Sequence, residues 1–344
     1  MTFSPTMSST RRTRARTISR TVRRAAARLP IVAALAAGTL GALAGTASAE
    51  TRVTLKSAKA GSSYYQMAVQ LAEAVRAGTD GEISITVEES QGSVQNVMEA
   101  AVRPGNYVFT SPPALIGLAR EDRAMFEGRG GERFDAVRAL FPIPSLTMHF
   151  VARADAGIES LEGLAGHTLL LGQGSFGATE GERYVSLFGL EGEVEIADAE
   201  LSNAVAALKN GQIDAFVTAG SWPAPNVVEA AASADVTVLS LTDEQVAETG
   251  RTRLEIPAGT YAGQDAPVVT TSLPVIAYAT AAMDDDTAYA LTRTYWEEKA
   301  RLGEEAAWWD GVDAALLGNV DTEIHPGAVR YYEEAGVALS DVQR

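Results

Sequence analysis

The chain has 344 residues, no cysteine, and 44 acidic against 28 basic side chains, which gives a net charge of −16 at neutral pH. An acidic surface repels nucleic acid and anionic lipid, so we exclude both as partners. Without disulfides the protein must be held together by its hydrophobic core, and a chain of this length can bury one.

Residues 1–49 have the pattern of a secretory signal peptide. They contain eight arginines and no acidic residue, then an apolar run from Leu29 to Gly45, then Ala47-Ser48-Ala49, which fits the small-residue cleavage rule. We therefore expect cleavage before Glu50. The run is shorter than the roughly 20 residues that span a bilayer, which argues against a membrane anchor. The arginine pairs suggest export by the twin-arginine pathway, but the residues that flank them match the signal of that pathway poorly. We therefore favour export by the general secretory pathway.

The expected mature chain of 295 residues carries 20 basic and 44 acidic side chains, a net charge of −24. Because it has no cysteine, it has no site for a lipid-modified N-terminus. A free exported protein is retained near the cell only by an outer membrane. We therefore expect a Gram-negative periplasm as its location.

The first part of the mature chain repeats a strand, a small polar turn and a helix. Strands are expected at 52–55, 83–87 and 107–110, and helices close at Gly78 and near Val102. This alternation is typical of an α/β fold with a mostly parallel sheet. Ligands of such sheets bind beyond the carboxyl ends of the strands.

The second part continues the same alternation after a charged, glycine-rich loop at 121–136. Two separate strands are expected at 137–141 and 147–152. Further strands are expected at 168–171, 194–196, 213–217, 236–241 and 268–281, with helices from 178, at 202–209, at 226–232, at 287–302 and around 308–309.

The most informative motif is Gly172-Gln173-Gly174-Ser175-Phe176-Gly177, between a short strand and a helix. It fits the G-x-G-x-x-G pattern of dinucleotide sites. Nicotinamide cofactors are scarce outside the cytoplasm, however, so we expect no cofactor. The same turn would aim backbone N–H groups and the hydroxyls of Ser175 and Thr179 at a small anion.

Other polar turns follow strands in the same way, at 61–65, 90–96 and 218–223. Helix capping by serine would by itself account for several of them, Tyr64 or Tyr65 could belong to the core, and Trp222 could pack under a loop. Their shared position at strand ends nevertheless predicts one binding site. The candidate ligand-binding residues are Ser63, Tyr64, Tyr65, Gln91, Gly92, Ser93, Asn96, Ser111, Gln173, Gly174, Ser175, Phe176, Thr179, Gly220 and Trp222.

Nothing in the sequence indicates an enzyme. His149, His167 and His325 are far apart and lack metal-ligand spacing, and the chain has no G-x-S-x-G, H-E-x-x-H or P-loop motif. We therefore expect no catalytic residue and no metal site.

A set of segments in a fixed order carries a family resemblance. These segments are Gly61–Tyr65, Gln91–Asn96, Ala139-Leu140-Phe141-Pro142 through His149-Phe150-Val151, Leu208–Phe216, Ile256–Asp265, His325-Pro326-Gly327-Ala328 and Tyr331-Tyr332. Taken together, they resemble the TAXI group of extracytoplasmic solute-binding proteins, which serve tripartite ATP-independent periplasmic (TRAP) transporters. The sequence departs from the usual pattern at Gln95, where the family has Glu, and at Asn106, where it has Asp. Other departures are Lys59-Ala60-Gly61-Ser62-Ser63, Ser111-Pro112-Pro113 and the turn at 174–179.

The resemblance implies a two-lobed α/β fold of the type II periplasmic-binding-protein kind with hinge strands. Lobe one would combine residues 50–148 and 272–344, and lobe two would be 149–271. The implied function is capture of a small organic anion, such as glutamate or 2-oxoglutarate, and delivery to a TRAP permease. We expect a monomer. Two alternatives are a binding protein of an ATP-dependent importer for a sulfonate or phosphonate, and a periplasmic ligand sensor partner.

Overall fold

The computed structural model describes residues 50–60, 62–172 and 175–344. The predicted signal peptide at 1–49 and the candidate ligand-binding residues Gln173 and Gly174 lie outside the described residues, so they stay predictions. Among the helices that the structure describes, none has the length and hydrophobicity that a membrane span requires.

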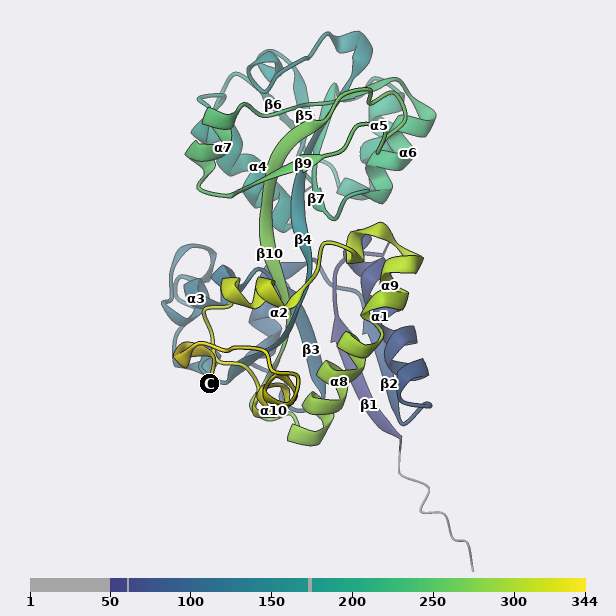
Figure 1. The fold of residues 1–344 in the computed structure, drawn as a ribbon. Helices are drawn as coiled ribbons and strands as arrows, with labels where there is room; N and C mark the ends of the chain where they lie inside the picture. Colours follow the sequence, from purple (N-terminus) through teal and green to yellow (C-terminus); the bar gives the residue numbers. More distant parts are fainter. Residues whose placement is uncertain (1–49, 61, 173–174) are drawn as a thin grey trace, which may run out of the picture. The chain divides into compact units, whose positions relative to one another are not determined.

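The described residues form a mixed α/β fold around one ten-stranded sheet (Figure 1). Along the sheet the order is β2-β1-β3-β10-β4-β7-β5-β6, while β8 pairs with β4 and β9 pairs with β10. The strands are β1 Thr51–Lys56, β2 Ile83–Glu88, β3 Tyr107–Ser111, β4 Val137–Arg153, β5 Thr168–Leu170, β6 Glu195–Ala197, β7 Ala215–Gly220, β8 Val236–Val238, β9 Thr252–Ile256 and β10 Val268–Thr280.

Parallel pairs lie toward both ends of the sheet and antiparallel pairs lie in its centre. β1 is parallel to β2 and β3, and β5 is parallel to β6 and β7. The long strands β4 and β10 are antiparallel to each other and to their other neighbours in the sheet. The predicted α/β fold is therefore confirmed, but the sheet is mixed rather than mostly parallel, because every pairing of β4 and β10 is antiparallel.

Both long strands change partner along their length. β10 pairs with β9 at 268–272 and with β3 at 276–278, while β4 pairs with β10 at 137–147 and with β7 at 147–152. The register of the β4–β10 ladder shifts between Leu273 and Val275, where Pro144 and Pro274 lie. Proline cannot donate to a ladder and is found at such irregularities. The two separate strands predicted at 137–141 and 147–152 are therefore wrong: they are one strand.

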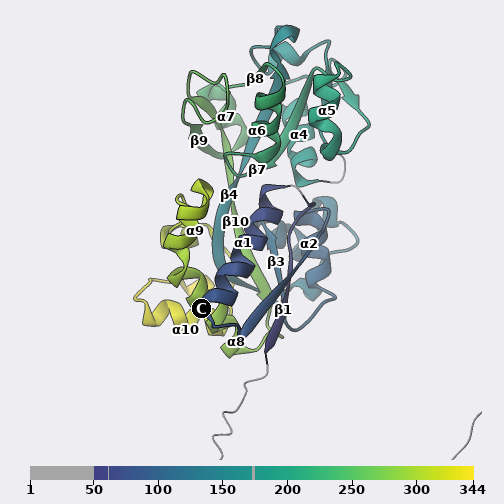
Figure 2. The ribbon, with the colours of Figure 1, turned by 90° about the vertical axis from the view of Figure 1, so that its right-hand side faces the viewer.

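Helices cover the sheet on both of its parallel parts (Figure 2). α1 buries Met67, Leu71 and Val75, the spacing of one helical face, and packs against β2, while α2 packs against β3. The helices are α1 Ser63–Gly78, α2 Ser93–Ala100, α3 Pro113–Arg120, α4 Phe176–Leu187, α5 Ala204–Lys209, α6 Pro225–Ser233, α7 Asp243–Thr249, α8 Asp285–Glu297, α9 Lys299–Glu305 and α10 Pro326–Glu334.

Candidate functional site

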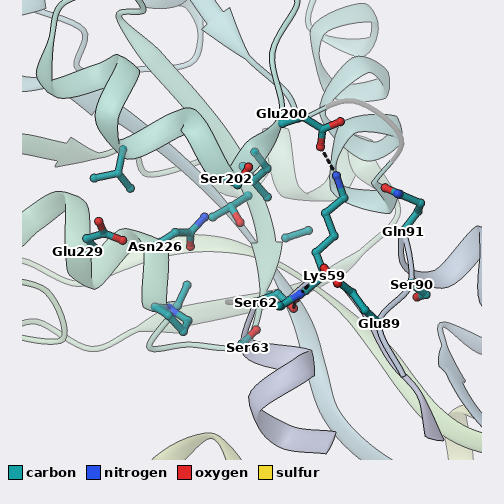
Figure 3. Close-up of a pocket in the computed structure, with 18 of the residues that line it drawn as sticks. Lys59, Ser62, Ser63, Glu89, Ser90, Gln91, Glu200, Ser202, Asn226 and Glu229 are labelled. Carbon is teal, nitrogen blue, oxygen red and sulfur yellow. Dashed lines mark hydrogen bonds and ion pairs between the residues drawn. The ribbon is translucent and has the colours of Figure 1, made fainter. Parts of the chain in front are cut away.

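A cavity of about 750 Å³ lies where the segments after β1, β2, β6 and β7 meet (Figure 3). We call it the outer cavity. Its wall therefore comes from both parallel parts of the sheet. The lining residues are Lys59, Ala60, Ser62, Ser63, Glu89, Ser90, Gln91, Gln95, Glu200, Leu201, Ser202, Val205, Thr218, Ala219, Gly220, Ala224, Pro225, Asn226 and Glu229.

A smaller cavity of about 90 Å³, the inner cavity, adjoins it and shares Lys59, Ser62, Gln91, Leu201 and Ala219 with it. Its wall is largely apolar, with several hydroxyl groups. The other lining residues are Ser57, Ala58, Tyr64, Gly92, Ser93, Thr110, Leu146, Gly172, Ser175, Phe176, Gly177 and Val275.

The N-termini of three helices meet at the inner cavity. Ser62 caps α1 by accepting from the Tyr65 N–H, and Ser175 caps α4 by accepting from the Ala178 N–H. α2 differs because its N-cap is Gly92, which has no side chain to cap the helix. The first N–H groups of α2 thus stay available at the cavity wall, where a helix N-terminus carries partial positive charge.

The charged side chains at the cavities are unevenly distributed. Of the described residues that line either cavity, Lys59 is the single cation, and it lines both. Its ammonium group forms an ion pair with Glu200 (Figure 3). Glu89 accepts from the Ala60 N–H at 2.8 Å, and exposed Glu229 lies at the other end of the outer cavity from Lys59.

Eight of the predicted site residues line these cavities, so the structure brings them together. Ser63 and Gly220 line the outer cavity, and Gln91 lines both. The five that line the inner cavity only are Tyr64, Gly92, Ser93, Ser175 and Phe176. Their part in ligand binding stays a prediction.

Five other predicted residues are not among the lining residues: Tyr65, Asn96, Ser111, Thr179 and Trp222. Asn96 is fully buried, and its amide donates to the carbonyls of Ser57 at 2.7 Å and Thr110 at 2.9 Å. It therefore holds the end of β1 to the end of β3, beside the cavities. Trp222 packs against the apolar cluster around β7.

Two of the lining residues also join distant parts of the chain. The Ser63 hydroxyl accepts from the Ser221 N–H at 3.0 Å, and a Cβ added at Gly220 would lie 2.7 Å from that hydroxyl oxygen. The Tyr64 hydroxyl donates to the Pro144 carbonyl of β4 at 2.8 Å. Burial raises the pKa of Tyr64 well above its usual value, so this phenol stays a neutral donor.

His149 supports the wall of the outer cavity from behind. Its Nε2 lies 2.8 Å from the Tyr261 hydroxyl, which in turn accepts from the Ala224 N–H at 3.0 Å. Its Nδ1 faces the Thr147 carbonyl at 3.2 Å. Burial lowers the pKa of His149 to about 4. The ring is thus neutral, with its proton on Nδ1, and Tyr261 donates to Nε2 while holding Ala224 at the start of α6.

Comparison with known proteins identifies the family. A family model described as the NMT1-like family matches residues 55–336. The chain belongs to the NMT1-like family.

Solved structures with the same fold as this NMT1-like chain include periplasmic binding proteins. The periplasmic binding protein BugD is 15% identical, with a TM-score of 0.50 over 84% of this chain and 98% of that one. MatC from Rhodopseudomonas palustris, solved with bound malate, is 13% identical, with a TM-score of 0.50 over 75% and 88% of the two chains. The predicted fold of the periplasmic-binding-protein kind is confirmed.

Sequence reasoning missed several charged or polar residues of the outer cavity, among them Lys59, Glu200, Asn226 and Glu229. Lys59 could have been found, because it is the cation nearest to the first predicted polar turn. The other three follow the ends of β6 and β7, and only the folded chain brings them opposite Lys59. Among the described residues, no group of His, Asp or Glu side chains is arranged to hold a metal ion.

Proposed function

We propose that this member of the NMT1-like family is an extracytoplasmic solute-binding protein that captures a small organic carboxylate. The observation that carries the proposal is the meeting of Lys59 with the uncapped N-terminus of α2 at the inner cavity. A carboxylate there would accept from backbone N–H groups and from an ammonium group. Charge-assisted hydrogen bonds of this kind are stronger than neutral ones.

The surroundings suit a carboxylate in two further ways. The hydroxyls of Ser93 and Thr110 line the inner cavity and supply donors besides Lys59 and the α2 backbone. Phe176, Leu146 and Val275 form apolar wall beside them, which excludes water and strengthens the remaining polar contacts. MatC, which shares the fold, was solved with bound malate, and this supports a ligand with a carboxylate group without fixing how many such groups it carries.

The proposed capture involves two lobes, 50–148 with 272–344 and 149–271, which close on the ligand by bending at β4 and β10. The change of partner along both strands supports this division, since it separates the ladders of β1–β3 from those of β5–β9. The outer cavity takes its wall from both proposed lobes, so closure would bury the ligand between them.

The proposed partner is the integral membrane permease of a TRAP transporter, and the proposed location is the periplasm after removal of residues 1–49. The support is the resemblance of ordered segments to the TAXI group, together with the periplasmic-binding-protein fold. On this proposal the protein releases its ligand unchanged, and no residue acts as a catalyst. Uptake by liposomes that carry a TRAP permease, with and without the purified protein, tests the partner.

The binding function is tested by calorimetry and thermal shift on residues 50–344 with a panel of organic acids, sugars and amines. We expect at least one carboxylate to bind and to raise the melting temperature. Lys59→Gln should weaken that binding by about tenfold or more, because it removes a charge-assisted hydrogen bond. Lys209→Gln, an exposed change in α5, is the matched control. Binding of sugars or amines alone would refute the proposal.

A further inference from the structure

The charges of the outer cavity limit which carboxylate can bind. We infer that the ligand carries one carboxylate and no second anionic group, and that Glu200 and Glu229 reject acids with two carboxylates. This inference rests on the proposed function and narrows its ligand class. It follows from the charge of the lining, the direction of the outer cavity and the polar groups along it.

The cavities hold too little positive charge for a dianion. The described lining of the outer cavity has three carboxylates, Glu89, Glu200 and Glu229, against the ammonium of Lys59 alone. That ammonium is already paired with Glu200. An incoming carboxylate must therefore share Lys59 with Glu200. The three helix N-termini at the inner cavity each add only about half a unit charge, and those of α1 and α4 are already capped by serine side chains. One ligand carboxylate can be compensated in this way, and a second one cannot.

The geometry determines what a second anionic group would meet. The outer cavity extends from Lys59 and Gln91 at one end, past Ser202 and Asn226, to Glu229 at the other end (Figure 3). A ligand that places its carboxylate at Lys59 directs the rest of its body toward Glu229. A distal carboxylate would then lie near the like charge of Glu229 and be repelled by it, most strongly at low ionic strength because Glu229 is exposed.

The remaining lining indicates the nature of that body. Gln95, Ser202, Thr218 and Asn226 offer amide and hydroxyl groups that can donate or accept hydrogen bonds. A cavity of about 750 Å³ is in the range of sites for compact organic ligands. The ligand class is thus a monocarboxylic acid whose body bears hydroxyl or amide groups.

The test uses two pairs of acids that differ at one end only. Glutamine and glutamate differ by an amide in place of a carboxylate, and gluconate and glucarate differ by a hydroxymethyl group in place of a carboxylate. Calorimetry on residues 50–344 at low ionic strength should give tighter binding of the monocarboxylate, glutamine or gluconate, in every pair of which a member binds. The preference should decrease as salt is added, because it is electrostatic.

The two glutamates are tested by removing their charge. Glu200→Gln and Glu229→Gln should each strengthen binding of the dicarboxylate by about threefold to tenfold relative to its monocarboxylate partner. Glu248→Gln, the same change at an exposed position of α7 outside the cavities, should leave that ratio unaltered. Circular dichroism and thermal melting establish that each variant is folded.

The possible results distinguish a failure of this inference from a failure of the proposed function on which it rests. Tighter binding of glutamate or glucarate than of its partner, or an unaltered ratio in both glutamate variants, would overturn the inference and leave carboxylate capture standing. If the wider panel contains no acid that binds at millimolar concentration, carboxylate capture itself fails.

Discussion

At the residue scale, His149 couples stability to pH. Its ring is held neutral by burial, with a pKa of about 4 against 6.5 in the unfolded chain. Between these values the unfolded state binds a proton that the native state does not. The contribution of neutral His149 to the free energy of unfolding is therefore fully present above pH 6.5 and is lost as pH falls toward 4. Urea unfolding should show a loss of about 2 kcal/mol from this residue between pH 7 and pH 5.

Carboxylates also titrate at the acid end of this window, so a variant must isolate the histidine. His149→Gln keeps an acceptor for the Tyr261 hydroxyl but has no ionisable group. The slope of unfolding free energy against pH should therefore be shallower in His149→Gln than in the natural chain. Equal slopes for the two proteins would show that His149 is not held neutral.

At the element scale, the position of α4 depends on glycines that let it lie directly on β7. A Cβ added at Gly177 would lie 2.9 Å from the Ala219 Cβ and 3.1 Å from the Ala219 nitrogen. Gly177→Ala must therefore move α4 away from the strand, and overpacking of this kind costs about 1–3 kcal/mol. Thermal and urea unfolding should show that loss, and ligand affinity should fall as well, because Ser175 and Phe176 begin the same helix.

The matched control lies in α3. Gly117 is also helical, but a Cβ there would meet no atom within 4 Å. Gly117→Ala should leave stability equal or raise it by up to about 1 kcal/mol, because alanine is the better helix former. If Gly177→Ala were as stable as Gly117→Ala, the close packing of α4 on β7 would not determine the position of α4.

Elements with a clear local pattern could be predicted from the sequence, and elements with conflicting local patterns could not. The alternation of apolar and polar residues predicted a strand at 83–87, which ends one residue before the observed end of β2. α3 was missed because Pro112-Pro113 was taken as the end of a strand, whereas proline is favoured in the first turn of a helix. The predicted helix at 287–302 is two helices, α8 and α9, which are separated at Glu298.

At the scale of the whole molecule, the candidate site could be predicted only in part. The polar turns at strand ends were identified because each is local. The lining of the outer cavity joins residues as far apart as Lys59 and Glu229, and no local pattern indicates which side chains will face each other across it. The charge balance of the cavity, on which its ligand class depends, is therefore a property of the folded chain.

The contact between Ser63 and Gly220 joins the two proposed lobes, and Gly220 has no side chain to hinder it. Gly220→Ala would place a Cβ only 2.7 Å from the Ser63 hydroxyl oxygen, closer than a van der Waals contact, and would disrupt the hydrogen bond that this oxygen accepts from the Ser221 N–H. We expect weaker ligand binding, since closure would lose this bond and meet a steric obstacle. Small-angle scattering with saturating ligand should give a larger radius of gyration than for the natural chain.

A second variant separates the obstacle from the lost bond. Ser63→Ala removes the hydrogen bond but adds no bulk, so its cost should be limited to about 0.5–1.5 kcal/mol of binding free energy. Combined with Gly220→Ala it removes the oxygen that the new Cβ would meet, so the double variant should bind more tightly than Gly220→Ala alone. That rescue is expected only if the two proposed lobes meet at this contact in the ligand-bound protein. Additive losses in the double variant would mean that Ser63 and Gly220 are apart when ligand is bound.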